Sequence, residues 1–237
     1  MLEAINLSKT YGGHQALAGL NLSVAPGEVF CLLGANGAGK TTTINLFMGF
    51  ISPSAGQVKI NDLDITARSR ESKKHLAYIP ENLNLYGNLT GLENLQFFAG
   101  LGGEKPDSSH SEQLLNSVGL QSEAMHKRVS QYSKGMRQKV GIAIAKAKKA
   151  DNLLLDEPTS GLDPQASNDF AQLLQNMRQN NVAILMATHD LFRAKESGTH
   201  IGIMKSGQLI HSLNSDEITL TELEHLYLET MKAESHA

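Results

Sequence analysis

The chain contains one segment whose residue types and spacing are those of a phosphate-binding loop. It reads Gly34-Ala-Asn-Gly-Ala-Gly-Lys40-Thr41 and matches G-x-x-x-x-G-K-[ST] at every fixed position. Glycines let such a loop bend until consecutive backbone amides point inward at a polyphosphate. Lys40 would then reach the β and γ phosphates, and the Thr41 hydroxyl would bind Mg²⁺. We therefore expect a nucleoside polyphosphate with its magnesium ion at this loop.

This loop stands between a predicted strand and a predicted helix. Val29–Leu33 is apolar throughout, as a buried strand is, and a helical run through Ile44, Leu46 and Phe47 follows the loop. That context favours phosphate binding over a glycine-rich turn with an exposed lysine, because a helix start also attracts anions. Kinases, GTPases and ATPase motors share the loop, so other residues must decide among them.

Two adjacent carboxylates end a second predicted strand. The apolar residues Leu153-Leu-Leu155 lead directly to Asp156 and Glu157. Asp156 is placed to hold Mg²⁺, which leaves Glu157 to polarise a water molecule. A random Asp-Glu pair is usually surface charge, but the strand before it and the run Pro158–Pro164 after it favour a site.

Short apolar runs alternate with helical patterns, which predicts an α/β protein with a largely parallel sheet. The predicted buried strands are residues 29–33, 152–155 and 182–186. Asp163 is expected to cap a helix that has Pro164 in its first turn. The apolar face of that helix comprises Phe170, Leu173, Leu174 and Met177. Asn152 interrupts the apolar run of its strand and is expected to weaken it locally.

Between residues 82 and 150 the pattern changes to helices without a convincing strand, which indicates a helical insert. Thr90 and Glu93 have the spacing of a capping box, and residues 100–109 are rich in residues that favour a turn. The last helical face of this insert ends in lysines, which we interpret as a solvated helix end that complements the helix dipole. They are Lys146, Lys148 and Lys149.

The carboxyl-terminal part of the chain predicts a hairpin and a helix. Residues 201–210 read as two strands that turn at Ser206-Gly207, although longer loops are also compatible. The last twenty residues suggest an amphipathic helix followed by a frayed tail.

Composition excludes several classes of protein. The 237 residues carry 21 basic and 24 acidic side chains, which gives a net charge of −3. This charge does not indicate a large basic surface for nucleic acid. The single cysteine, Cys31, excludes an internal disulfide framework, and a reducing compartment fits best. We see no secretory signal, and the longest apolar runs are far short of the ~20 residues that cross a bilayer.

On these motifs and their order, the chain resembles the nucleotide-binding subunits of ATP-binding cassette (ABC) transporters over about residues 2–230. The resemblance implies a P-loop NTPase core with a mostly parallel sheet, an N-terminal antiparallel β subdomain and an inserted helical subdomain. It also implies one ABC ATPase domain over residues 1–237. Residues 1–81 and 151–237 would form the nucleotide-binding core, and residues 82–150 the helical signature subdomain.

The same resemblance implies a role for each site residue. Tyr11 resembles the aromatic residue that stacks on adenine, Glu157 the catalytic glutamate and His189 the switch histidine. Ser133 and Gly135 stand in the signature segment, which contacts the γ-phosphate held by the opposite subunit. The implied nucleotide-binding set is Tyr11, Gly34, Ala35, Asn36, Gly37, Ala38, Gly39, Lys40, Thr41, Thr42, Ser133 and Gly135, and the implied metal-binding set is Thr41, Asp156 and Glu81.

Two segments depart from the family pattern. The signature reads Tyr132-Ser-Lys-Gly-Met136 in place of Leu-Ser-Gly-Gly-Gln, so Lys134 either adds a charge-assisted contact or faces solvent. Glu81 stands where the family has a glutamine. Glutamate keeps an oxygen ligand, loses the amide donors and adds a negative charge, so coupling to a membrane partner is expected to differ in detail.

As a whole, the resemblance implies an ATPase that binds ATP and Mg²⁺, dimerises on ATP and powers transport through a separate transmembrane permease subunit. The second ATPase would be another copy or a paralogue, and no nucleic acid partner is expected. The motifs are most similar to the exporter-type branch, and residues 80–90 also resemble ATPases that serve nitrous-oxide reductase maturation. We expect partner docking at Leu83–Leu89 and a cytoplasmic location on the inner face of the membrane.

Two other functions are open at this stage. A soluble ABC ATPase would act on nucleic acid or protein assemblies, and it would be favoured by paired cassettes, a coiled-coil insert or a basic arm. A small-molecule kinase would use the same loop but would need an acceptor pocket and a lid.

Overall fold

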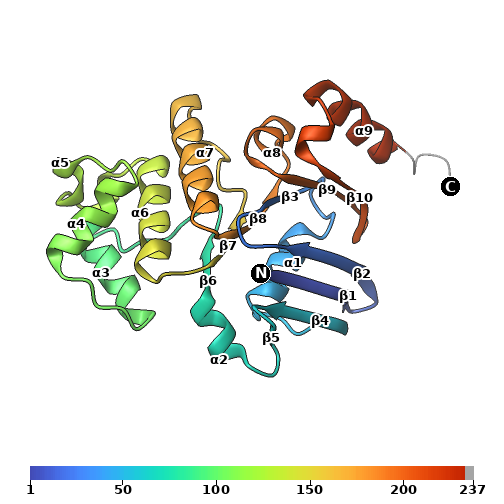
Figure 1. Cartoon of the computed structure of the whole chain (residues 1–237), viewed down its shortest axis with the longest axis horizontal. Coiled ribbons are helices and arrows are strands. Elements are labelled where there is room, and N and C mark those ends of the chain that lie inside the picture. The colour runs from blue at the N-terminus through green and yellow to red at the C-terminus, as the bar shows by residue number, and fades with distance from the viewer. Residues whose placement is uncertain (233–237) are drawn as a thin grey trace.

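Figure 1 shows the computed structural model of the chain, which describes residues 1–232. The expected frayed tail falls on residues 233–237 and so lies outside the described part. An antiparallel sheet lies at one end of the molecule, the helical segment of residues 82–150 at the other, and a larger sheet between them. Among residues 1–232, none of the helices combines the length and apolar character that a membrane crossing requires.

Six strands form the central sheet in the order β10-β9-β3-β8-β7-β6. Five of them are parallel and β10 pairs antiparallel with β9, so the predicted α/β class is confirmed. The strands are β3 (Val29–Leu33), β6 (Leu76–Ile79), β7 (Asn152–Asp156), β8 (Ala183–Thr188), β9 (His200–Lys205) and β10 (Gln208–Asn214). Because the carboxyl ends of parallel strands meet at one edge, the loops after β3, β6, β7 and β8 lie together.

Four strands form the antiparallel sheet in the order β2-β1-β4-β5. They are β1 (Leu2–Tyr11), β2 (His14–Val24), β4 (Ala55–Ile60) and β5 (Leu63–Asp64). This sheet is the N-terminal antiparallel β subdomain that the family resemblance implied. The first hairpin turns through Gly12 and Gly13, both with positive φ, and this tight turn places Tyr11 opposite His14.

Outside the helical segment, the helices are α1 (Lys40–Phe47), α2 (Ser69–Ser72), α7 (Pro164–Gln179), α8 (Leu191–Ser197) and α9 (Leu220–Lys232), with short 3₁₀ turns η1 (Lys73–His75) and η3 (Ser215–Glu217). Of these, α1, α7 and α8 directly follow strands of the central sheet, whereas α2 follows the antiparallel strand β5 and α9 follows β10 after a short 3₁₀ turn. The predicted cap of α7 is confirmed, because Asp163 accepts a hydrogen bond of 2.8 Å from the Ala166 amide. The predicted C-terminal hairpin is also confirmed and turns at Ser206 and Gly207, both with positive φ.

The segment between β6 and β7 is helical, as predicted. Its elements are α3 (Gly91–Leu101), α4 (Ser108–Ser117), α5 (Ser122–Met125), η2 (Val129–Gln131) and α6 (Lys134–Ala147). The capping box at Thr90 and Glu93 is present in both directions. The connection predicted at residues 100–109 is shorter, because α3 runs to Leu101 and α4 begins at Ser108 with Asp107 as its cap.

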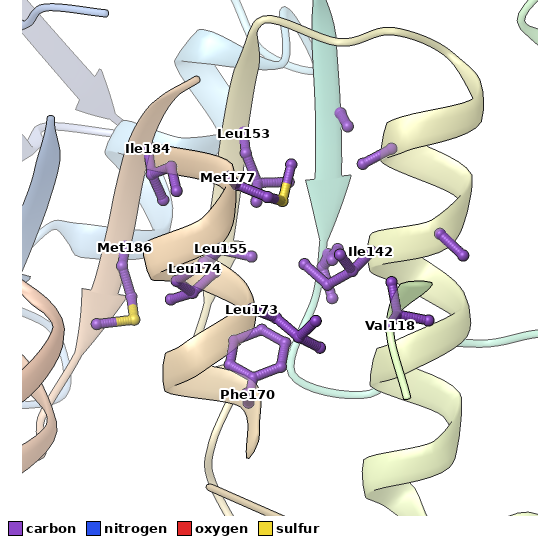
Figure 2. Close-up of a cluster of buried hydrophobic side chains, with 14 of the residues drawn as sticks. Val118, Ile142, Leu153, Leu155, Phe170, Leu173, Leu174, Met177, Ile184 and Met186 are labelled. Carbon is purple, nitrogen blue, oxygen red and sulfur yellow. The ribbon is translucent and has the colours of Figure 1, made fainter. Parts of the chain in front are cut away.

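Two hydrophobic clusters hold these layers together. Alternate residues of β7 serve different clusters: Leu153 and Leu155 face α6 and α7, whereas Leu154 faces α1 and the antiparallel sheet. This two-sided burial explains why the strand is apolar at successive positions. Figure 2 shows the first cluster, in which Phe170 and Met177 of α7 lie between β7 and α6. The predicted apolar face of α7 is therefore the face that packs on the sheet.

Two polar side chains behave differently from the sequence expectation. Asn152 does not merely weaken β7: it is fully buried, and its amide donates to the Asn61 side chain and the His75 carbonyl, each at 3.2 Å. Lys148 is not a freely solvated helix end, because its Nζ donates to the Leu76 carbonyl at 3.1 Å and burial lowers its pKa. Both residues tie the start of β6 to neighbouring elements.

Candidate nucleotide site

The loop after β3 folds tightly against the antiparallel sheet. Gly39 has φ of 108°, and a Cβ at that position would lie 2.8 Å from the Ala16 carbonyl oxygen. A Cβ at Gly34 would lie 2.7 Å from the Met204 carbonyl oxygen. Since both contacts are with backbone, larger residues cannot be accommodated without moving the loop. The glycines therefore allow the close backbone approach on which the loop geometry depends.

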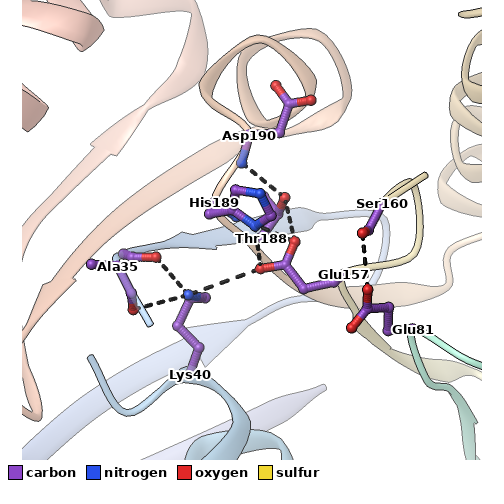
Figure 3. Close-up of polar contacts among 9 residues, drawn as sticks. Ala35, Lys40, Glu81, Glu157, Ser160, Thr188, His189 and Asp190 are labelled. Carbon is purple, nitrogen blue, oxygen red and sulfur yellow. Dashed lines mark hydrogen bonds and ion pairs between the residues drawn. The ribbon is translucent and has the colours of Figure 1, made fainter. Parts of the chain in front are cut away.

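Lys40 begins α1 and turns back over its own loop. Its Nζ donates to the carbonyls of Gly34 at 2.5 Å and Ala35 at 3.2 Å, and it lies 3.9 Å from a carboxylate oxygen of Glu157 (Figure 3). Burial lowers the pKa of Lys40, and the nearby carboxylates of Glu157 and Asp156 oppose that shift. The ammonium is thus held in a partly dehydrated position, where the negative charge of a polyphosphate would stabilise its protonated form.

Asp156 ends β7 beside this lysine. Burial raises its pKa, and a hydrogen bond donated by the Thr41 hydroxyl is the main opposing effect. The charges of Glu157 and Glu81 raise the pKa further, while Lys40 lowers it. A hydroxyl and a carboxylate in mutual contact are hard oxygen donors, so Thr41 and Asp156 are chemically suited to a magnesium ion.

Glu157 is fixed from several sides although its backbone is strained, with φ of 47°. One carboxylate oxygen lies 2.9 Å from His189 Nδ1, and the other accepts a hydrogen bond of 3.2 Å from the Thr188 hydroxyl (Figure 3). Its side chain is only 15% exposed. A positive φ at a non-glycine residue is uncommon and persists where surroundings over-determine it. The carboxylate is therefore held in position before any ligand arrives, as a group that orients water must be.

These side chains surround one cavity of about 510 Å³. Of the residues predicted for the site, the cavity is lined by Tyr11, Ala35, Asn36, Gly37, Gly39, Lys40, Thr41, Thr42, Glu81, Asp156 and Glu157. Gly34 and Ala38 are buried within the loop beneath it, and His189 lines an adjoining cavity that shares Glu157. The structure thus brings together residues that are up to about 150 positions apart in the chain.

Ser133 and Gly135 are the predicted site residues that the structure does not bring to this cavity. Ser133 caps α6, where its Oγ accepts a hydrogen bond of 3.2 Å from the Met136 amide. Gly135 packs against α7, since a Cβ there would lie 3.0 Å from the Ala166 Cβ. The signature segment therefore lies outside the cavity of its own chain.

The cavity also includes residues that sequence reasoning missed, His14 and Ala16. The signal for His14 was present in the sequence, because a Gly-Gly pair between two strands predicts a two-residue hairpin turn. Such a turn pairs Tyr11 with His14 and points both side chains to one face.

A phosphate loop between a buried strand and a helix, with carboxylates at the end of a neighbouring parallel strand, defines a P-loop NTPase. A family model described as ABC transporter matches residues 17–160. The chain is 34% identical over 219 residues to the bacitracin transport ATP-binding protein BcrA of Bacillus licheniformis, covering 92% of this chain and 71% of BcrA. It is 34% identical over 220 residues to the probable multidrug ABC transporter ATP-binding protein YbhF of Escherichia coli K12. That match covers 92% of this chain, which spans 38% of the length of YbhF.

Solved structures agree with these relatives. One described as the ATP binding subunit of an ABC transporter superposes with a TM-score of 0.85 and 29% identity, covering 98% of this chain and 99% of the other. The dimeric cassette MJ0796, bound to ADP and Pi after hydrolysis, has a TM-score of 0.81 and 25% identity, covering 91% and 99%. The chain therefore belongs to the ABC transporter ATP-binding family.

Proposed function

We propose that this chain hydrolyses ATP as a two-subunit assembly and thereby powers a separate membrane-spanning partner. The observation that carries the proposal is the Glu157 carboxylate, held by His189 and Thr188 beside the buried Lys40 in one cavity. Phosphoryl transfer to water needs positioning and charge stabilisation more than covalent chemistry, and this arrangement supplies both.

The donor set of the cavity fits a magnesium ion. Thr41 and Asp156 are in contact, and Glu81 lines the same cavity, so a hydroxyl and two carboxylates are available as oxygen ligands. When bound, the ion would neutralise charge on the phosphate oxygens. Lys40 would release its loop carbonyls in favour of the phosphates, while Glu157 accepts a proton from the attacking water and His189 keeps that carboxylate in place.

Two chains are needed because the signature segment lies outside the cavity of its own chain. In a head-to-tail dimer with two-fold symmetry, Ser133 and Gly135 of each chain would close the cavity of the other. The partner chain would be a second copy or a paralogue. Each chain would be one cassette domain, with residues 82–150 as the part that reaches across.

Phosphate release gives a direct test of this arrangement. The rate per chain from Mg·ATP, with no other acceptor than water, is expected to rise with chain concentration until dimers saturate. Sedimentation velocity in the same buffers would give the fraction of dimer at each concentration. Replacement of Ser133 by alanine is expected to lower the rate and leave ATP binding to the monomer unchanged, because Ser133 contacts only the nucleotide of the other chain.

A full rate per chain at concentrations where sedimentation finds monomers alone would contradict the dimeric mechanism. Transfer of phosphate to a small molecule but not to water would favour a kinase instead. Copurification with nucleic acid rather than with a membrane protein would contradict the transport role.

For the membrane partner we propose a docking groove next to the predicted segment Leu83–Leu89. The groove is a cavity of about 630 Å³ between the start of β6 and helices α3 and α6. Tyr86 of the predicted segment stacks on Phe98, which lines the groove, and the ring centroids are 5.8 Å apart. Leu101 lines the groove and is 72% exposed. Phe50, whose ring meets the ring of the groove residue Tyr78 edge-on, is 61% exposed. Docking here would hold the chain at the cytoplasmic face of the membrane.

Charge indicates the character of the docking segment. Four cationic side chains line the groove: Arg70, Lys73, Lys74 and Lys148. An amphipathic helix with acidic side chains would match both the cations and the exposed apolar residues, because helices lay one apolar face into such grooves.

Reversal of two of these charges tests the groove. In cells that make the full chain at its native level, the Lys73→Glu/Lys74→Glu variant is expected to leave the membrane fraction while retaining ATP binding. Fractionation and immunoblotting would measure its distribution. The matched control is Lys105→Glu/Lys127→Glu, which changes the charge equally at exposed lysines outside the groove. Equal membrane shares for the two variants would contradict this docking site.

A further inference from the structure

A cavity of about 540 Å³ opens between α6 and α7, at the edge of the central sheet opposite the nucleotide site. Asp151 and Val182 line it, and they directly precede β7 and β8, whereas the nucleotide-site residues Asp156 and Glu157 come at the far end of β7. The volume lies within the range of about 300–1,000 Å³ that is usual for small-molecule sites. The cavity is therefore separate from the nucleotide site and large enough for a ligand.

The floor of this cavity is apolar. It includes Ile142 of α6, Leu173 and Met177 of α7, and Val182, and each of these side chains is at most 8% exposed. Figure 2 shows Ile142, Leu173 and Met177 in the space between the two helices. Methionine adapts its shape to a neighbouring group because its side chain is unbranched and flexible. The floor can therefore accommodate the apolar body of a ligand.

Two lysines stand at the rim of the cavity. Lys146 Nζ donates to the hydroxyl of Ser117, a neutral partner, at 2.6 Å, and partial burial lowers the pKa of this lysine. Lys149 Nζ lies 3.4 Å from a carboxylate oxygen of Glu104, but the two side chains are 77% and 41% exposed. Such exposed ion pairs contribute little free energy. Both ammonium groups can therefore turn to an anion at modest cost.

The carboxylates near the cavity are held by other partners. The Asp151 carboxylate accepts hydrogen bonds from the side-chain amides of Asn152 at 2.7 Å and Asn61 at 2.9 Å. On α7, Asp169 pairs with Lys139 of α6 at 2.8 Å. Since these negative charges are already engaged, the two lysines give the rim a cationic character.

We propose that this cavity binds a small organic anion with an apolar body, such as a medium-chain carboxylate. The apolar chain would lie on the floor, while the carboxylate would accept charge-assisted hydrogen bonds from Lys146 and Lys149. The Asn176 amide, also at the rim, could donate a further hydrogen bond. A free anion suits the cavity better than a lipid bilayer does, because the apolar side chains line a recess and form no exposed patch there. The proposal does not depend on the proposed ATPase function.

Titration calorimetry of the nucleotide-free full chain with sodium octanoate tests the proposal. We expect saturable binding of one octanoate per chain. Affinity is expected to rise by about two- to fourfold for each CH₂ added from butanoate to octanoate, because each buried CH₂ contributes up to about 0.8 kcal/mol. Octylammonium, which has the same chain and the opposite charge, is expected not to bind.

Matched variants test the two parts of the cavity. Lys146→Met/Lys149→Met is expected to lower the affinity for octanoate about three- to tenfold or more, the effect of losing one or more hydrogen bonds to the anion. Lys105→Met/Lys127→Met removes the same charge at exposed lysines outside the cavity and should leave the affinity unchanged.

A bulky side chain at the rim should block the cavity. Asn176→Trp is expected to abolish octanoate binding, whereas Gln175→Trp, at the neighbouring exposed position of α7 outside the cavity, should not. Both positions are on the exposed face of the helix, so the fold should tolerate either change, and circular dichroism would verify this.

Methionine methyl resonances locate the bound anion. Met177 lines this cavity and Met48 lines the docking groove, which also carries lysines. Octanoate is expected to shift the Met177 resonance, assigned with Met177→Leu, and to leave that of Met48 in place. A shift at Met48 alone, an affinity independent of chain length, or equal effects of the two lysine pairs would overturn the proposal. Lys146-dependent flotation with phosphatidylglycerol vesicles in the absence of octanoate binding would also overturn it and indicate a lipid surface instead.

Discussion

A Glu157→Gln chain is expected to bind ATP normally, to accumulate as an ATP-bound dimer, and to release phosphate about 100- to 10,000-fold more slowly than the wild type, the usual contribution of a general base. Glutamine keeps the size of the side chain and can still contact Thr188, but it cannot accept the proton of the attacking water. Single-turnover phosphate release and sedimentation with and without ATP would measure both effects.

The change at Glu157 has a matched control at a surface carboxylate. Glu104→Gln removes one negative charge from a residue paired with Lys149 at 3.4 Å, away from the cavity, and should leave turnover unchanged. If Glu157→Gln hydrolysed ATP at the wild-type rate, the base would have to be another group. A variant that failed to bind ATP would instead indicate that Glu157 supports the loop through its contact with Lys40.

Local signals in the sequence predicted the parts of the fold that depend on neighbouring residues. The cap at Asp163, the capping box at Thr90 and the phosphate loop ending at Thr41 each occupy fewer than ten consecutive positions, and each has the predicted structure. The two caps satisfy backbone groups within their own segment, so the surrounding fold has little influence on them.

The parts that could not be predicted depend on contacts between distant segments. Asn152 looked like a defect in a strand because its partners, Asn61 and the His75 carbonyl, come from other loops. Lys148 looked solvated because the Leu76 carbonyl lies 72 positions away. A buried polar group is tolerated when it is paired, and pairing across the fold leaves no spacing rule in the sequence. The same reason hid the hydrogen bond of 2.9 Å that the Ser160 hydroxyl donates to the Glu81 carboxylate.

Lys40 and Asp156 are partly removed from solvent, and each also lies close to other charged side chains of the site. Burial lowers the pKa of Lys40 and raises that of Asp156, so burial disfavours the charged form of both groups at neutral pH. When folding lowers the pKa of a lysine, the folded protein becomes less stable as the pH falls through that pKa. When folding raises the pKa of an aspartate, the folded protein becomes less stable as the pH rises through that pKa. Between these two pKa values, both effects make the protein less stable while no ligand is bound. A bound polyphosphate would relieve the effect at Lys40.

The largest loss of nucleotide binding is therefore expected from replacement of Lys40. Lys40→Met keeps the aliphatic part of a side chain that is 5% exposed, yet removes the ammonium that contacts Gly34 and Ala35. The affinity for ATP is expected to fall about 10- to 100-fold, because a hydrogen bond to a charged group contributes about 1.5–3 kcal/mol. Affinity for adenosine should change little, since it has no phosphate. Titration calorimetry with both ligands would measure the difference.

The adenosine comparison also separates a lost phosphate contact from a disrupted loop. If Lys40→Met weakened both ligands equally, the variant would have lost the shape of the cavity, and circular dichroism would show whether the fold had changed. Lys105→Met, at an exposed position outside the cavity, should leave both affinities unchanged. Wild-type ATP affinity in Lys40→Met would contradict the assignment of the loop itself. In that case the cavity beside Glu157 would have to bind its ligand through the other groups that line it.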